Sequence, residues 1–285
     1  MCDNDIHQGL VEDWRLSRRA FVATGMVAGI ATAAHAADNV VEKDVTITTP
    51  DGTCDAALFY PAGKGTWPTV LVWPDIMGLR PVFRDMARRL SAEGYVVLVP
   101  NPFYRSKHAP VVEGAFDFNN AEARKTLFGY RAAMTDEGVE KDATAYLAFL
   151  DAQKQTAKGK KAGVQGYCMG GPLSFHTGAA VPNRIGAIAT FHGGGLVTDT
   201  PASPHLLIPK TKAAYLICVA KNDDAREPKS KDVLKDALKA AGRPGTVEVY
   251  PGDHGWTVPG SQVYDQAAAE RAWAALAAFY KANLV

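Results

Sequence analysis

The sequence is poor in cysteine, with four among its 285 residues, at positions 2, 54, 168 and 218. So few cysteines exclude a small fold held together by disulfide bonds, because such folds carry many cysteines in a short chain. Charge of one sign is not in excess either, since 31 lysines and arginines face 30 aspartates and glutamates. The formal net charge of +1 therefore gives no electrostatic reason to expect nucleic acid as a partner.

Other signals are also missing. No histidines, cysteines or carboxylates recur at the spacing of a metal site, so the sequence predicts no metal, and it indicates no other cofactor. No internal repeat or low-complexity tract is visible. An apolar fraction of 47% can supply a sizeable core, and a chain of this length is compatible with one α/β domain.

The N-terminal segment has the features of an export signal. Arg18 and Arg19 precede an apolar, Gly- and Ala-rich stretch at residues 20–34, and Ala34-His35-Ala36 matches the small-x-small pattern of a signal-peptidase site. Residues 1–36 are therefore predicted to be a cleaved signal of twin-arginine type, read by the twin-arginine export machinery and leading to the periplasm. The apolar stretch is too short for a membrane span, so no stable span is expected after processing. Residues 37–285 are expected to form a single domain.

Short apolar runs alternate with amphipathic stretches through the rest of the chain. Strands are expected around Val164 and at residues 45–48, 54–60, 69–73, 95–99, 185–191, 213–219 and 247–250. Helices are expected from Pro172 onward and at residues 81–93, 121–133, 139–152, 229–240 and 262–282. The first two strands read as an antiparallel pair, and the alternation that follows predicts an α/β fold with a mostly parallel central sheet and helices on both faces. Residues 101–118 read as a long loop at the rim of a site.

The segment Gly166-Tyr167-Cys168-Met169-Gly170-Gly171 lies between an expected strand and an expected helix. It has the pattern of a nucleophile elbow with cysteine in place of serine, and the glycines would leave room for a sharp, strained turn. The helix N-terminus would also favour a thiolate at Cys168. The alternative is that Cys168 is a small buried residue in an ordinary tight turn. Cys54 and Cys218 lie in apolar runs and are interpreted as core residues, with a disulfide between them left open.

A thiol nucleophile needs a base, and the base needs a group that orients it. His254 follows the last expected strand, in a loop flanked by glycines, and is the candidate base. Asp223 and Asp224 follow the preceding strand, and Asp223 is preferred as the orienting acid over Asp224 and over Asp253. The chain order of nucleophile, acid and histidine is that of the α/β-hydrolase fold.

Two backbone N–H groups are expected to form an oxyanion hole, that of Met169 directly after the nucleophile and that of Ile76 in the loop after residue 73. His192 opens a run of three glycines and is a candidate for lining the pocket. His176, within the expected helix after the elbow, is interpreted as a core histidine.

These stretches, together with residues 73–80, Asn222-Asp223 and His254-Gly255-Trp256, resemble the dienelactone hydrolase family, the cysteine-dependent branch of the α/β-hydrolases. The similarity extends from about residue 51 to the final helix. It implies the α/β-hydrolase fold and hydrolysis of a small ester or lactone through a thioester on Cys168, with His254 moving protons and Asp223 orienting it.

The resemblance also implies an acidic residue beside the thiol, and Asp75 occupies that position where the dienelactone enzyme has Glu. That enzyme binds its substrate carboxylate with arginines, but Val258 stands at one of those positions here. Arg105 and Arg124 are the remaining candidates for substrate binding, with an ordinary surface role as the alternative for each.

Two other classes of function are compatible with the sequence. A hydrolase scaffold can serve as a non-catalytic binding protein for small molecules, because a fold does not determine a function. A redox role for Cys168 is the third hypothesis, although the sequence offers no clear resolving cysteine.

Overall fold

The computed structural model describes residues 39–114 and 116–285. The predicted export signal, with Arg18, Arg19 and the cleavage site after Ala36, lies outside the described residues.

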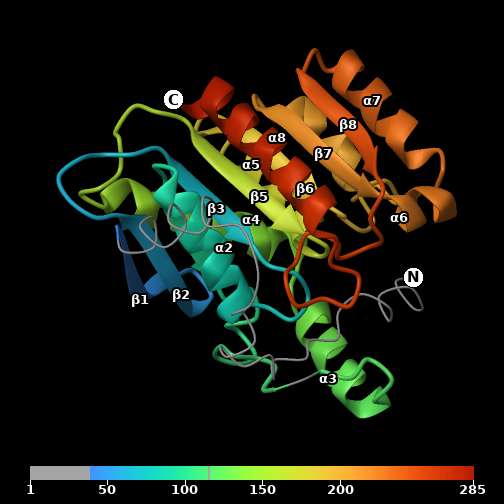
Figure 1. Cartoon of the computed structure of the whole chain (residues 1–285), viewed down its shortest axis with the longest axis horizontal. Helices are drawn as coiled ribbons and strands as arrows, with labels where there is room; N and C mark the ends of the chain where they lie inside the picture. Colours follow the sequence, from blue (N-terminus) through green and yellow to red (C-terminus); the bar gives the residue numbers. More distant parts are fainter. Residues whose placement is uncertain (1–38, 115) are drawn as a thin grey trace, which may run out of the picture.

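One eight-stranded sheet runs through the described part of the chain (Figure 1). Its strands are β1 (Val40–Thr49), β2 (Gly52–Pro61), β3 (Thr69–Trp73), β4 (Val96–Pro100), β5 (Ala162–Tyr167), β6 (Ile185–Phe191), β7 (Ala214–Ala220) and β8 (Gly245–Tyr250). The spatial order is β1-β2-β4-β3-β5-β6-β7-β8. The strands from β3 to β8 pair in parallel, whereas β2 pairs antiparallel with both β1 and β4.

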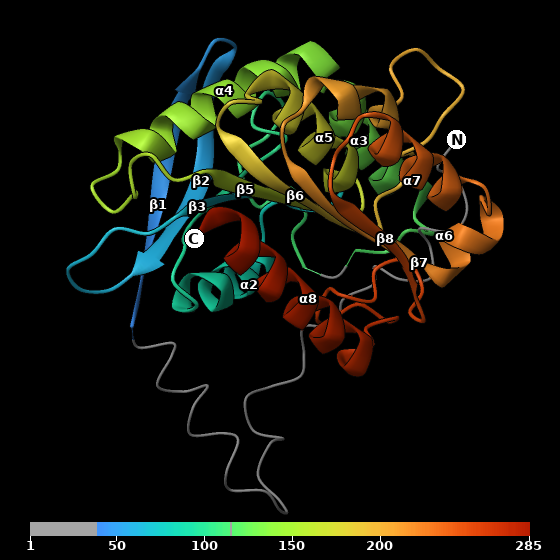
Figure 2. The same ribbon diagram turned by 90° about the horizontal axis from the view of Figure 1, so that it is seen from above.

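Helices cover both faces of the sheet, as the sequence predicts (Figure 2). On one face lie α2 (Pro81–Ala92) and α8 (Gln266–Leu284), and on the other α4 (Asp136–Ala152), α5 (Gly170–Ala180) and α7 (Ser230–Ala240). The buried apolar side chains accordingly form two clusters, one on each side of the sheet. Every residue of β3, β4 and β5 is buried, which explains the nearly continuous apolar sequences of β3 and β4. In β5 the buried Gln165 is hydrogen-bonded to Tyr167 and Tyr280. None of the described helices is long and apolar enough to cross a membrane.

The remaining described helices are α3 (Ala121–Ala132), α6 (Lys221–Arg226) and the 3₁₀ helix η2 (Pro204–Lys210). The sequence patterns missed α6 and η2, because a helix of one or two turns carries too few residues for a periodic pattern. The predicted start of the last helix at residue 262 is wrong. Asp265 accepts a hydrogen bond from the Ala268 N–H and caps α8, so the helix begins at Gln266.

The carboxyl ends of the parallel strands meet at one edge of the sheet. The loops after β3, β5, β6 and β8 start there, and so does α6, which follows β7 directly. Residues 101–120 between β4 and α3 contain no helix or strand among those described. Ligands of open α/β sheets bind at this edge. Cys54, Cys168 and Cys218 are free thiols in the interior, so the disulfide considered between the first and last of them is not formed.

Candidate active site

Cys168 lies between β5 and α5 with a backbone φ of 51°, in the left-handed region that side chains other than glycine rarely adopt. Close backbone approach holds this turn. A Cβ at Gly166 would stand 1.9 Å from the Gly170 carbonyl oxygen, and one at Gly170 would stand 2.4 Å from the Trp73 carbonyl oxygen. The glycines on both sides of Cys168 are therefore required sterically. The Cys168 side chain is 4% exposed.

His254 and Asp223 are joined by a hydrogen bond of 2.7 Å between Nδ1 and Oδ2. Both side chains are buried, and they come from the loop after β8 and from α6 respectively. Of the other two carboxylates considered, Asp224 pairs with Lys231 at 2.6 Å and Asp253 with Lys221 at 3.5 Å. Asp223 is therefore the carboxylate that contacts His254.

Asn222 and Arg226, to which the sequence analysis assigned no role, hold this pair. The Asn222 side-chain oxygen accepts the His254 backbone N–H at 2.8 Å, and Arg226 donates to the second oxygen of Asp223 at 2.8 Å. The Trp256 ring is fully buried and stacks on Tyr250 at 5.4 Å between ring centroids. The spacing of three between Asp223 and Arg226 could have indicated the ion pair, but only once α6 is known to be helical.

The His254 pKa is raised to about 10. Burial by itself lowers this pKa, but the negative charge of Cys168 and the hydrogen bond to Asp223 outweigh burial. Within the described residues, no group meets hydrogen-bond geometry with His254 Nε2, although Cys168 is close enough to interact with the ring electrostatically. The site therefore favours the protonated, imidazolium form of His254.

The loop after β3 packs directly against the elbow, as the contact between Gly170 and the Trp73 carbonyl requires. This loop carries Ile76, and Met169 is the N-cap residue of α5. Both residues are buried at the strand edge that holds Cys168.

Asp75 is fully buried and bound to Arg80, with oxygen–nitrogen distances of 2.6 and 2.9 Å. Its Oδ1 also accepts the Met77 N–H at 2.9 Å, and the Gly78 N–H donates to its carbonyl at 2.9 Å. Among the residues that the structure describes, no hydrogen bond joins Asp75 to Cys168. The carboxylate that the resemblance assigns to the thiol thus holds the shape of the loop that carries Ile76.

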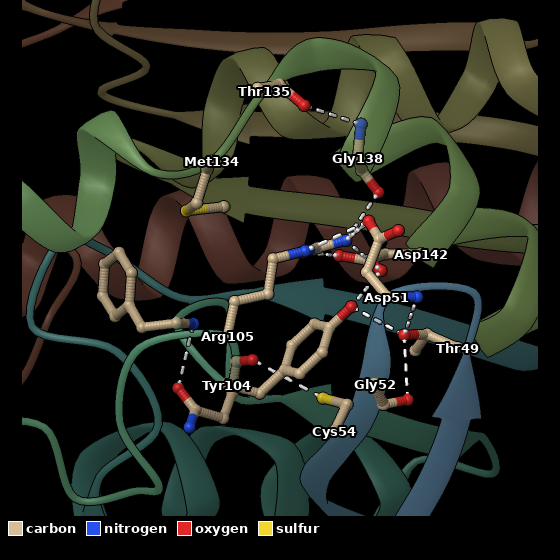
Figure 3. A network of polar contacts seen from close by, with 12 residues as sticks. Thr49, Asp51, Gly52, Cys54, Tyr104, Arg105, Met134, Thr135, Gly138 and Asp142 are labelled. Carbon is tan, nitrogen blue, oxygen red and sulfur yellow. Dashed lines mark hydrogen bonds and ion pairs between the residues drawn. The ribbon is translucent and has the colours of Figure 1, made fainter.

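Arg105, predicted to bind substrate, instead enters a network with β1, β2 and α4 (Figure 3). It binds Asp142 at 2.7 and 2.9 Å and Asp51 at 2.6 Å. The Tyr104 hydroxyl donates to Asp142 at 2.7 Å and is 2.7 Å from the Thr49 hydroxyl. Burial raises the pKa of Asp142, and Arg105 and Tyr104 counteract that effect.

This network lies away from the elbow. In the sheet, β2 is three strand spacings from β5, or about 14 Å, and β1 is one spacing further. The Arg105 guanidinium is occupied there by two carboxylates, so its role is to attach residues 101–118 to the edge of the sheet. Substrate binding by Arg105 stays a prediction, and these two ion pairs give its guanidinium a structural role.

The other candidates have defined environments. Arg124 is half-buried on α3, with a contact of 3.5 Å to the Phe118 carbonyl. The His192 ring is fully buried, 5.0 Å from the His254 ring, with Nε2 2.9 Å from the Thr257 hydroxyl. His176 is buried on α5 and contacts Glu140 at 3.1 Å, in keeping with its interpretation as a core histidine. In the described ranges, no cluster of three or more histidines, cysteines or carboxylates could hold a metal ion.

Comparison with protein families gives one assignment. The model of the dienelactone hydrolase family matches residues 54–284. A protein of Methylorubrum extorquens that is provisionally named carboxymethylenebutenolidase is 28% identical, over 86% of this chain and 85% of its own length. The carboxymethylenebutenolidase of Rhodococcus opacus is 26% identical, over 65% of this chain and 68% of its own length.

Solved structures support the same fold. A protein of Klebsiella pneumoniae with the provisional name dienelactone hydrolase superposes with a TM-score of 0.73 at 21% identity, covering 85% of this chain and 98% of that one. A dienelactone hydrolase-like promiscuous phosphotriesterase from metagenomic libraries superposes with a TM-score of 0.70 at 22% identity, covering 87% of this chain and 100% of that one. The predicted α/β-hydrolase fold is thereby confirmed.

We predict that Arg105→Gln lowers the free energy of unfolding by about 1–3 kcal/mol, because it leaves the buried Asp142 carboxylate without its cation. Its partial exposure of 18% keeps the loss below that of a fully buried pair. Arg271→Gln breaks an exposed pair with Glu248 and should cost less than about 1 kcal/mol. Urea unfolding measures both. A raised KM for a carboxylate-bearing lactone, with stability unchanged in Arg105→Gln, would restore the substrate-binding role.

Proposed function

The chain belongs to the dienelactone hydrolase family, and on that premise we propose that it hydrolyses a small ester or lactone through a thioester on Cys168. In this proposal His254 transfers protons, Asp223 orients His254, and the N–H groups of Met169 and Ile76 stabilise the oxyanion. The observation that carries the proposal is the strained Cys168 beside a buried histidine that is already hydrogen-bonded to a carboxylate. That combination is the requirement for an activated nucleophile.

Acylation follows from the charges of the site. The Cys168 thiolate attacks the carbonyl carbon, and the carbonyl oxygen takes up the negative charge at the N–H groups of Met169 and Ile76. The carbon–oxygen bond to the leaving group then breaks, and the His254 imidazolium gives its Nε2 proton to the departing alkoxide. For an ester the alcohol leaves, whereas for a lactone it stays attached to the acyl group.

Deacylation depends on a change in the pKa of His254. The thioester carries no charge, so the contribution of Cys168 that raises this pKa in the free enzyme disappears on acylation. The histidine, neutral after its proton transfer, then stays neutral and can accept a proton from water. Water attacks the acyl carbon, the carbon–sulfur bond breaks, and the thiolate beside an imidazolium is restored with release of the carboxylic acid.

The proposal is restricted to the reaction class. Val258, at the position where the resemblance implies an arginine, is apolar and fully buried, and Arg105 is bound to Asp142 and Asp51. Neither residue supports recognition of a substrate carboxylate. A neutral short-chain ester or lactone fits the apolar surroundings of Cys168 best, since Ile76, Met77 and Leu196 belong to the same buried cluster.

We predict that Cys168→Ala reduces turnover of a short-chain aryl ester by about three orders of magnitude or more, because the covalent step is removed. The wild-type protein should gain the mass of one acyl group on Cys168 after brief incubation with an activated ester. Cys218→Ala is the matched control. Burial raises the pKa of the Cys218 thiol to about 12, so this thiol should not react with the ester, and its removal should leave turnover unchanged. Several activated esters without adduct or turnover would instead favour a non-catalytic binding protein.

The pH dependence of kcat/KM provides a second prediction. His254 in the free enzyme has a pKa raised to about 10, so its proton is available below that pH and is lost above it. We expect kcat/KM to fall as the pH rises through about 10, after subtraction of hydrolysis by Cys168→Ala. Asp223→Asn removes one interaction that raises this pKa and should move the alkaline limb to lower pH. An alkaline limb at the same pH in both proteins would contradict the assignment of Asp223.

We also propose that the protein is exported to the periplasm through its paired arginines, Arg18 and Arg19. Their replacement by Lys should retain the protein in the cytoplasm of an expressing bacterium, and N-terminal sequencing of the exported form should begin near Ala37. Detection of the uncleaved chain in the cytoplasm alone, with both arginines present, would argue against export.

A further inference from the structure

His192 occupies a strained position directly after β6. Its φ of 42° lies in the left-handed region, and the only other described residue except glycine with a positive φ is Cys168. Such a conformation is strained in a residue with a side chain. The next three residues are glycines, which adopt it without strain. Glycine would fit this turn without strain, so the presence of histidine indicates that the imidazole has a function at this position.

The ring of His192 lies inside the site. Its centroid is 5.0 Å from that of His254 and 5.3 Å from that of Trp256, and the side chain is fully buried. The loop that carries it also touches the elbow, since the Cys168 N–H donates to the Phe191 carbonyl at 3.1 Å. A Cβ at Gly171 would stand 2.7 Å from the Gly193 Cα, so the two backbones are too close for a side chain at residue 171.

The two nitrogens of His192 differ in their surroundings. Nε2 is 2.9 Å from the Thr257 hydroxyl, whereas Nδ1 is buried and has no hydrogen-bond partner among the described residues. The Nε2 of the neighbouring His254 is buried as well, and in the free enzyme Cys168 is the group that interacts with this side of the ring. An unsatisfied buried polar atom is unfavourable, and a buried water commonly satisfies it.

The charge state of His192 allows its ring to accept a hydrogen bond from a water. Burial and the charge of His254 hold the pKa of His192 well below its usual range, so the ring is neutral. A neutral imidazole has one N–H donor and one acceptor nitrogen. The pair of Nε2 and the Thr257 hydroxyl allows either direction, and in the tautomer in which Nε2–H donates to Thr257, Nδ1 is the acceptor.

We propose that His192 positions the water that hydrolyses the acyl-enzyme, with Nδ1 accepting one hydrogen of that water while His254 Nε2 accepts the other. This inference rests on the proposed function. Both hydrogens of the water are then held, and a lone pair on its oxygen remains for the acyl carbon on Cys168. In the step itself His254 takes the proton, the carbon–sulfur bond breaks, and His192 keeps its protonation state.

The experiment separates the two halves of the reaction with p-nitrophenyl acetate. Rapid mixing records the burst of nitrophenol, which reports acylation, and the steady rate that follows reports deacylation. His192→Gln retains a polar group near the Nε2 position and lacks one at Nδ1. We expect its burst to keep nearly the wild-type rate, its steady rate to fall about 10- to 100-fold, and the acyl-enzyme to accumulate on Cys168.

Two further variants and the reagent hydroxylamine distinguish the proposed role of His192 from misfolding of the His192→Gln variant. His192→Asn places an amide near the Nδ1 position and suits a positive φ, so it should recover part of the steady rate. His176→Gln makes the same change at a buried histidine on α5, outside the site, and should leave the ratio of burst to steady rate unchanged. Hydroxylamine attacks the thioester without the positioned water and should restore turnover in His192→Gln.

Equal losses of burst and steady rate in His192→Gln, or no rescue by hydroxylamine, would overturn the role of His192 while leaving Cys168 as nucleophile. A wild-type protein that forms no acyl adduct would instead overturn the proposed function itself. Thermal unfolding of each variant identifies a general loss of structure.

Discussion

Backbone crowding around Cys168 is the constraint on which the rest of the site depends. Three loops meet there with almost no side-chain atoms between them: the elbow touches the loop after β3 through Gly170 and the loop after β6 through Gly171. These contacts force Cys168 into its left-handed conformation and bring the segments of Ile76 and His192 against it. A side chain at either contact would separate the nucleophile from its surroundings, because packed backbone cannot yield by rotamer changes.

The charged side chains around Cys168 form separate ion pairs. Arg226 and His254 share the carboxylate of Asp223, while Arg80 holds Asp75 in the neighbouring loop. The second pair is buried, and it shapes the loop of Ile76 through the Met77 N–H. Asp75 is bound in this way, and the groups that raise the pKa of His254 are Cys168 and Asp223.

Periodicity and turn chemistry were sufficient for most of the fold. The buried strands, the two layers of helices and the edge that carries Cys168, Asp223 and His254 all follow from apolar runs and their order along the chain. Short helices were not predictable: α6 has six residues, and no periodic signal distinguishes it from a loop. The role of Arg105 was also beyond the sequence, because Asp51 and Asp142 lie 54 and 37 residues from it and only packing brings them together.

The sequence by itself determined the family, the nucleophile-elbow pattern and the candidates for base and acid, because these depend on residue type and local spacing. Tertiary structure decided which carboxylate meets His254, which arginine binds Asp75, and that the His192 ring lies beside His254 with one nitrogen free of protein partners among the described residues. Those outcomes depend on distances of a few ångströms between separate loops. Such distances are set by how the strands and helices pack, and no local pattern in the chain encodes them.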